Sequence, residues 1–172
     1  MAEGRVRRHL AAILAADVVG YSALMEKDET GTFDRLRAHR KELFEPQIKA
    51  CNGRIFKLLG DGLLAEFASV VDAVQCAITL QREMARRNSE GKDGERIDVR
   101  ISVNLGDVII EGKDRYGDGI NIAARLQELA EPGGIAVSGW AYDHLTGKLD
   151  LPIEFVGQLQ VKNIERPVRV YR

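Results

Sequence analysis

The stretch that decides the fold is ILAADVVG at residues 13–20, an apolar run that ends in an aspartate and a glycine turn. A similar stretch, FKLLGDG, follows at residues 56–62. An unpaired charge at the tip of a buried strand is costly, so Asp17 and Asp61 together favour a shared cation. Hard oxygen ligands indicate Mg²⁺ or Mn²⁺. The alternative is that Asp17 and Asp61 are exposed turn residues that bind no metal, because aspartate followed by glycine is common in turns.

The turn after the first aspartate leads into a predicted helix, which Gly20, Tyr21 and Ser22 open. The first N–H groups of a helix have no partner within the helix, and they attract anions. This turn therefore predicts a place for the phosphates that would accompany a bound divalent cation.

The composition fits one globular domain and argues against several classes of protein. A chain of 172 residues can bury one substantial core. The net charge is −1, and acidic and basic residues are mixed along the sequence, so no broad basic surface points to nucleic acid. Cys51 and Cys76 lack metal-ligand spacing, and two cysteines do not make a disulfide framework, which favours a reducing compartment. With no apolar run of membrane-spanning length and no signal-peptide character at the start, a soluble, cytoplasmic protein is expected.

Hydrophobic periodicity predicts alternating strands and helices. Strands are expected at 9–18, 54–59, 63–67, 97–103, 105–111, 135–138, 153–156 and 168–171, with a bend near Gly106. Helices are expected at 21–50 with a break near 28–31, after a cap at Ser69, at 120–129 and at 140–145, with loops at 88–95 and 112–119. This order predicts an α+β fold. Its core would be a ferredoxin-like βαββαβ unit with helices on one face of a mostly antiparallel sheet, followed by C-terminal α/β additions.

A third segment, DRYGDGINIAAR at residues 114–125, combines a loop with the start of a helix. Asn121 and Arg125 are four residues apart and therefore share one helix face. The forked donors of arginine suit phosphate, so this pair favours an anionic substrate, and a solvated helix face is the alternative. The glycines do not form the dinucleotide-binding fingerprint, and the sequence contains no P-loop.

Together these segments resemble the class III nucleotidyl cyclases, the catalytic domains of adenylyl and guanylyl cyclases. Three motifs carry the resemblance in family order: ADVVGYS at 16–22, FKLLGDG at 56–62 and YGDGINIAAR at 116–125. A weaker match is VKN at 161–163. The resemblance covers residues 9–172, which are expected to form the catalytic domain after an N-terminal extension at residues 1–8.

The resemblance implies two divalent ions per site, Mg²⁺ or Mn²⁺. Asp17 and Asp61 would bind them with the backbone carbonyl of Val18. Lys162 would hold the terminal phosphates. The β- and γ-phosphates would be bound by backbone N–H groups of Val19, Gly20, Tyr21 and Ser22.

The remaining matched residues would act on the base, the ribose and the reacting phosphate. Lys57 and Asp114 would read the base, and Asn121 would orient the ribose. Arg125 would stabilise charge on the α-phosphate in the transition state.

In this family the site lies between two catalytic domains, with the aspartates on one and the other groups on its partner. The resemblance therefore implies a homodimer with two equivalent sites at its interface. The expected activity is that of an adenylyl cyclase, which converts ATP to cyclic AMP and pyrophosphate. A guanylyl cyclase and a catalytically silent nucleotide-binding dimer module are the alternatives.

The sequence departs from the common family pattern at a few positions. Ser102 and Asn104 stand where glycine and histidine are frequent, and both are expected near the core of a strand, away from the substrate. Tyr21 stands where phenylalanine is common. The three histidines, His9, His39 and His144, are scattered and are expected to have structural or surface roles.

Overall fold

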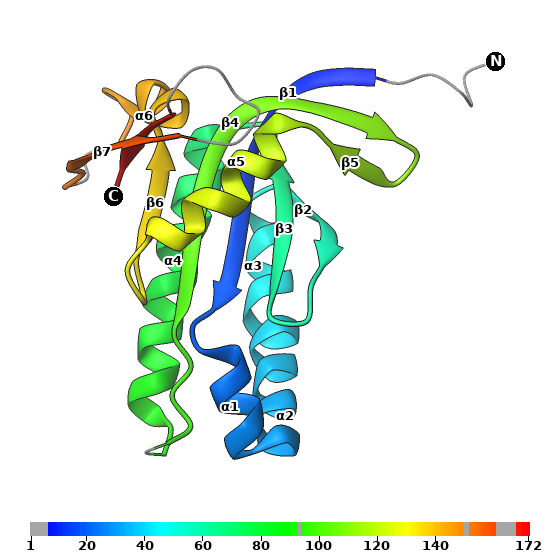
Figure 1. Ribbon diagram of the computed structural model, residues 1–172, viewed down its shortest axis with the longest axis vertical. Helices are drawn as coiled ribbons and strands as arrows, with labels where there is room; N and C mark the ends of the chain where they lie inside the picture. Colours follow the sequence, from blue (N-terminus) through cyan, green and yellow to red (C-terminus); the bar gives the residue numbers. More distant parts are fainter. Residues whose placement is uncertain (1–6, 93, 150–151, 161–167) are drawn as a thin grey trace.

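A long antiparallel pair of strands forms the centre of the molecule (Figure 1). β1 (Arg7–Val18) pairs with β4 (Val99–Glu111) along its whole length in continuous register. The computed structural model describes residues 7–92, 94–149, 152–160 and 168–172. None of the helices in these ranges is both long and apolar enough to cross a membrane.

The sheet extends from this pair in the order β2-β3-β1-β4-β6-β8-β7, with β5 added beside β4. Its other strands are β2 (Gly53–Leu58), β3 (Gly62–Phe67), β5 (Asp114–Tyr116), β6 (Ile135–Ser138), β7 (Phe155–Leu159) and β8 (Val168–Tyr171). Of the pairings in the described part of the chain, only that of β4 with β6 is parallel. The order β2-β3-β1-β4 is that of a ferredoxin-like core, so the predicted α+β class and mostly antiparallel sheet are confirmed.

Helices cover both faces of this sheet. They are α1 (Tyr21–Lys27), α2 (Glu29–His39), the π-helical turn η2 (Arg40–Phe44), α3 (Glu45–Ala50), α4 (Val70–Glu90), α5 (Asp118–Leu126), the 3₁₀ turn η3 (Gln127–Leu129) and α6 (Gly139–Leu145). The predicted break in the first helical segment is confirmed. Asp28 ends α1, and its side chain accepts a hydrogen bond from the N–H of Gly31 at 3.0 Å.

The core helices α3 and α4 pack on one face, as predicted for the βαββαβ unit, whereas α5, which follows that unit, covers the other face. Residues 11–16 of β1 are each at most 5% exposed, so both faces of this strand are buried. The even-numbered residues face the larger core with α3, α4 and α6, whereas the odd-numbered ones pack under α5. Figure 1 shows α5 in front of the strands and α4 behind them. A strand that is apolar on both sides needs cover on both faces.

Helix α5 lies very close to β4. A Cβ atom on Gly106 of β4 would lie 2.9 Å from the Cα of Gly119 in α5. The predicted continuation of the strand past Gly106 is confirmed, because β4 is unbroken there and Gly106 pairs with Ala11, and β4 curves over in its upper part (Figure 1). Gly106 also allows the close approach of α5.

Two buried polar side chains of β4 also hold α5. The hydroxyl of Ser102 donates to the carbonyl of Ala123 at 2.5 Å, and the amide of Asn104 donates to the carbonyl of Gly119 at 2.9 Å. Both side chains are fully buried. Ser102 and Asn104, two of the residues that depart from the common family pattern, therefore hold α5 on β4 from within the core.

Other differences from the predicted elements lie near their ends. α4 continues to Glu90 into the predicted loop, and β4 begins at Val99 and not at Ile97. The predicted loop at 112–119 contains β5 and the start of α5, because residues 114–116 pair with the end of β4. Strand β7 begins at Phe155, two residues after the predicted start.

We predict that Gly106→Ala destabilises the protein by about 1–3 kcal/mol, the usual cost of adding volume to a packed interior. The added methyl group would meet the backbone of Gly119, which cannot rotate away. Thermal unfolding measures this change. Gly60→Ala is the control, since its Cβ would meet only the Tyr21 hydroxyl, at 3.7 Å. Equal melting temperatures for the two variants would contradict the close approach.

Candidate active site

The two aspartates of the first two motifs lie at the same end of the sheet. Asp17 pairs with Gly62 across β1 and β3, and the N–H of Val18 donates to the carbonyl of Asp61 at 2.8 Å. A Cβ on Gly62 would lie 2.1 Å from the carbonyl oxygen of Ala16, so a glycine is required directly after Asp61. The backbone at this point thus holds the two carboxylates together.

Asp17 has an unusual environment for a carboxylate. Its Oδ1 is buried without a hydrogen-bond partner, and its Oδ2 accepts from the Gln127 amide at 3.2 Å. Burial, followed by the hydrogen bond and charge of Asp61, raises the pKa of Asp17 from its ordinary value of 3.8 to about 6. The hydrogen bonds from Gln127 and the Val18 backbone act in the opposite direction. A divalent cation would offset the cost of burying the charged Asp17 carboxylate and its repulsion from Asp61.

The donor set fits a metal that the substrate helps to bind. The described ranges contain no cluster of three or more His, Cys, Asp or Glu side chains that could hold a metal. Mg²⁺ needs no such cluster, because it is commonly held by one or two carboxylates together with water and substrate phosphates. The unpartnered oxygen of Asp17 supplies an available ligand.

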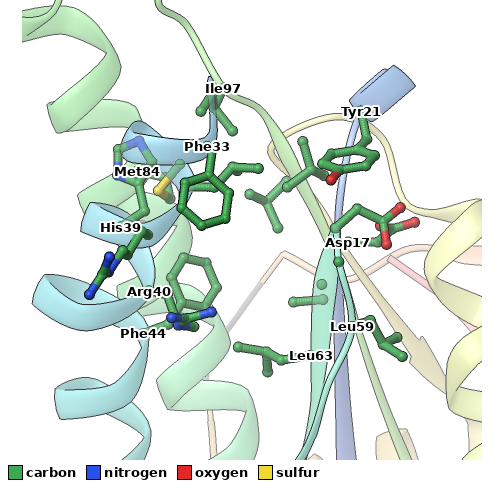
Figure 2. Close-up of a pocket in the computed structure, with 18 residues that line it drawn as sticks. Asp17, Tyr21, Phe33, His39, Arg40, Phe44, Leu59, Leu63, Met84 and Ile97 are labelled. Atoms are coloured by element: carbon green, nitrogen blue, oxygen red, sulfur yellow. The ribbon is translucent and has the colours of Figure 1, made fainter. Parts of the chain in front are cut away.

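An apolar cavity of about 240 Å³ lies beside the aspartates (Figure 2). Asp17 and Tyr21 lie along one side in this view, and Phe33, Phe44 and Met84 lie along the other.

The turn after β1 is the segment that the sequence predicted to bind phosphates. Gly20 caps α1 with a φ of 65°, a left-handed conformation that favours glycine. The N–H of Val19 donates to the carbonyl of Asp98 at 2.9 Å, which removes it from the predicted set of phosphate donors. No hydrogen bond is described for the N–H groups of Gly20, Tyr21 and Ser22, which lie at the start of α1, where backbone N–H groups have no partner within the helix.

A β-bulge sets the position of Lys57. The register of β2 against β3 shifts between Ile55, which pairs with Ala65, and Lys57, which pairs with Leu64. Leu64 belongs to the core under α5, so Lys57 lies on the α5 face of the sheet and is exposed. Simple alternation from Ile55 would have placed it on the opposite face. Bulges often redirect side chains in this way next to active sites.

Asp114 lies in β5 and not in a loop. It is exposed, and its carboxylate accepts from the Tyr116 hydroxyl at 3.2 Å. The next residue, Arg115, contacts Glu66 of β3 at 3.1 Å, and their side chains are only 7% and 14% exposed. This ion pair fastens β5 to the strand beside the one that carries Lys57.

The pair on α5 is turned away from the protein interior. Asn121 and Arg125 are both exposed, and their side chains make no hydrogen bond or ion pair within the described ranges. Lys162 lies outside the described residues. In a single chain, Asn121 and Arg125 are therefore available to a ligand or to a partner.

The sequence analysis missed two residues beside Asp17. Arg100 pairs with Asp17 across β1 and β4, and its Nε is buried without a hydrogen-bond partner. Gln127 donates to Asp17 from η3. Strand register brings Arg100 close to Asp17, and the packing of α5 on β4 brings Gln127 close. The spacing of residues within a motif reveals neither contact.

The histidines have surroundings consistent with structural or surface roles. His9 lies 3.6 Å from Glu66, and Nδ1 of His144 lies 3.0 Å from the carbonyl of Trp140. His39 lines the apolar cavity, where burial and then the charge of Arg87 lower the pKa of its imidazole.

The sequence matches the family described as "Adenylate and Guanylate cyclase catalytic domain" over residues 6–171. The chain therefore belongs to this family, and it is a class III nucleotidyl cyclase domain, as the three motifs indicated.

Relatives and solved structures agree with this assignment. "Putative adenylate cyclase 3" of Rhizobium meliloti (strain 1021) is 48% identical over 171 residues, which cover 99% of this chain and 29% of that protein. The chain thus spans less than a third of that relative's length. The crystal structure of "Adenylate/Guanylate Cyclase/Hydrolase" from Silicibacter pomeroyi is 42% identical with a TM-score of 0.90, covering 97% of each chain. The adenylyl cyclase CyaB from P. aeruginosa has a TM-score of 0.82 at 23% identity, covering 97% of this chain and 94% of that one, which shows the shared fold.

We predict that Asp17→Asn stabilises the metal-free protein at pH 7.5. The raised pKa means that the wild-type protein gains stability as the pH falls from about 6 towards 4, and lacks this contribution above pH 6. After allowance for solvent screening the gain is about 1 kcal/mol, or roughly 2–4 °C in melting temperature. The difference between variant and wild type should shrink towards pH 4.

Thermal unfolding at several pH values in the presence of a chelator measures this effect. Asp34→Asn is the matched control, because Asp34 is exposed and makes no described ion pair. A variant that is less stable than wild type at pH 7.5 would show that Asp17 does not carry the electrostatic cost assigned to it.

Proposed function

We propose that this chain is the catalytic domain of an adenylyl cyclase, a phosphorus–oxygen lyase that converts ATP to 3′,5′-cyclic AMP and pyrophosphate. The observation that carries the proposal is the meeting of Asp17 and Asp61 beside a turn with unbonded N–H groups. The names of relatives at 48% and 32% identity, which both include adenylate cyclase, support it. A cytoplasmic location, as expected from the sequence, would suit a consumer of ATP.

The metal-binding part of the site would consist of Asp17, Asp61 and the carbonyl of Val18. Two Mg²⁺ or Mn²⁺ ions, when bound there, would lower the pKa of the ribose 3′-hydroxyl and neutralise the triphosphate. Residues Gly20, Tyr21 and Ser22 would donate backbone hydrogen bonds to the β- and γ-phosphates. Val19 would shape this turn through its bond to Asp98, which is a narrower role than the one first expected.

Cationic side chains would complete the neutralisation of the triphosphate. Arg100 stands opposite Asp17 with a buried nitrogen in need of an acceptor, which a phosphate oxygen would supply. Lys162 is proposed for the terminal phosphates from its sequence match. Asn121 would orient the ribose, and Arg125 would stabilise the charge that develops on the α-phosphate.

The reaction would take place between two chains. Asn121 and Arg125 have no described partner in their own chain, and they lie exposed on the helix that covers one face of the sheet. A homodimer would bring this pair to the aspartates of the other chain and would form two equivalent sites. Holding the 3′-hydroxyl in line with the α-phosphorus is then mainly a matter of positioning.

Base recognition favours adenine. Lys57 can only donate and an ionised Asp114 can only accept hydrogen bonds, which matches the N1 acceptor and N6 donor of adenine. Guanine presents the reverse pattern. In the structure Lys57 makes no ion pair within the described residues, so the alternative that it merely pairs with a nearby carboxylate has no support.

We predict at least a hundredfold preference for ATP over GTP in kcat/KM. Each buried mismatch with guanine would leave polar groups unpaired at about 1–3 kcal/mol, and about 1.4 kcal/mol corresponds to tenfold. Lys57→Glu combined with Asp114→Gly should weaken or reverse the preference, because glutamate can accept from guanine N1–H. The measurement is turnover in Mn²⁺ with identification of products by mass. Equal efficiency with both nucleotides would place base recognition elsewhere, and absence of any cyclic product would favour the silent module.

We also predict that a mixture of Asp17→Ala and Arg125→Ala chains recovers activity, although each variant alone is inactive. The mixed dimer would contain one site with all of its residues intact. Two pairs are controls that should not recover, because each member lacks a group from the same side of the site: Asp17→Ala with Asp61→Ala, and Asn121→Ala with Arg125→Ala. Failure of the first pair, with mixed dimers shown to form, would argue for a site within one chain.

A further inference from the structure

Gln127 contacts a candidate metal ligand from an unexpected direction. Its Nε2 donates to the Oδ2 of Asp17 at 3.2 Å, while the Oδ1 of Asp17 is buried without a partner. The neighbouring Asp61 is itself a carboxylate, so the Gln127 amide is the neutral donor that holds Asp17. One oxygen of Asp17 is therefore fixed by the protein, and the other is left for a cation.

The turn that carries Gln127 continues the helix that carries Arg125. α5 ends at Leu126, and η3 begins at Gln127 without an intervening loop. η3 also packs against β1, β4 and β6. The contacts that seat α5 on β4, made by Gly106, Ser102 and Asn104, thus set the position of the Gln127 side chain as well.

We propose that Gln127 is a positioning residue that orients Asp17 for metal binding in its own chain's site, and that it links this site to the helix serving the partner's site. The proposal rests on the dimeric site proposed above. In that dimer, Gln127 would touch the aspartate of one site, while Arg125, two residues earlier on the same backbone, would act in the other.

Glutamine is chemically suited to this task. Its amide is a neutral donor that holds a carboxylate oxygen without adding charge between Asp17 and Asp61. Groups that orient a metal ligand in this way matter greatly, and their loss typically weakens metal binding by about 10–100-fold.

The first test measures Mn²⁺ binding by electron paramagnetic resonance in the absence of nucleotide. Gln127→Met keeps the length of the side chain and removes the donor, and its Mn²⁺ affinity should fall by about tenfold or more. Glu128→Gln is the matched control, because Glu128 is exposed in the same turn and has no described partner, so its affinity should stay unchanged. Thermal unfolding verifies that both variants are folded. Wild-type affinity in Gln127→Met would overturn the proposal.

The second test uses mixed dimers to assign the effect to one chain. In the pair of Asp17→Ala and Arg125→Ala chains, the working site takes its aspartates from the Arg125→Ala chain. Adding Gln127→Met to that chain should raise the Mn²⁺ concentration at half-maximal activity, whereas adding it to the Asp17→Ala chain should leave this concentration unchanged. An equal effect from either chain, or an effect only from the Asp17→Ala chain, would show that Gln127 acts through Arg125 and would overturn the proposal.

The outcomes separate this proposal from the dimeric function on which it rests. If the unmodified pair does not recover activity, the shared site is wrong. Mn²⁺ binding to the Gln127→Met protein then still decides whether Gln127 orients Asp17.

Discussion

The close approach of α5 to β4 is the constraint on which the site depends. Gly106 and Gly119 let the two backbones meet, and Ser102 and Asn104 fix the helix there by hydrogen bonds to its carbonyl groups. These bonds are fully buried, where an unmade hydrogen bond costs most. These contacts between α5 and β4 therefore determine where Asn121 and Arg125 face outward. They also determine where η3 approaches Asp17.

A second constraint is electrostatic. Asp17 is partly buried next to Asp61, and this arrangement raises its pKa to about 6 and disfavours its charged form. Such an arrangement is unfavourable for the isolated protein and becomes favourable when a divalent cation is bound. In a low-dielectric site the same charges also act more strongly on a triphosphate. The local cost in stability and the proposed chemistry thus have one physical origin.

The sequence predicted most of the architecture from periodicity and turn residues. The central strand, the β2–β3 hairpin, the break at Asp28 and the capped α4 follow from apolar spacing, glycine turns and capping side chains. Prediction from the sequence failed where the structure of a segment is set by contacts with residues far away in the chain. The contact of Gly106 with α5 was not predicted, and residues 114–116 were predicted to be a loop but pair with β4.

The sequence by itself determined the family, the two aspartates and the outward-facing pair on α5, because these depend on residue type and on spacing along one element. Only the tertiary structure decided that Arg100 stands across from Asp17, that a bulge turns Lys57 to the α5 face, that the N–H of Val19 is already bonded, and that Gln127 holds Asp17. These facts depend on strand register and on the seating of a helix. Both are set by contacts between residues far apart in the chain, which spacing within a motif does not encode.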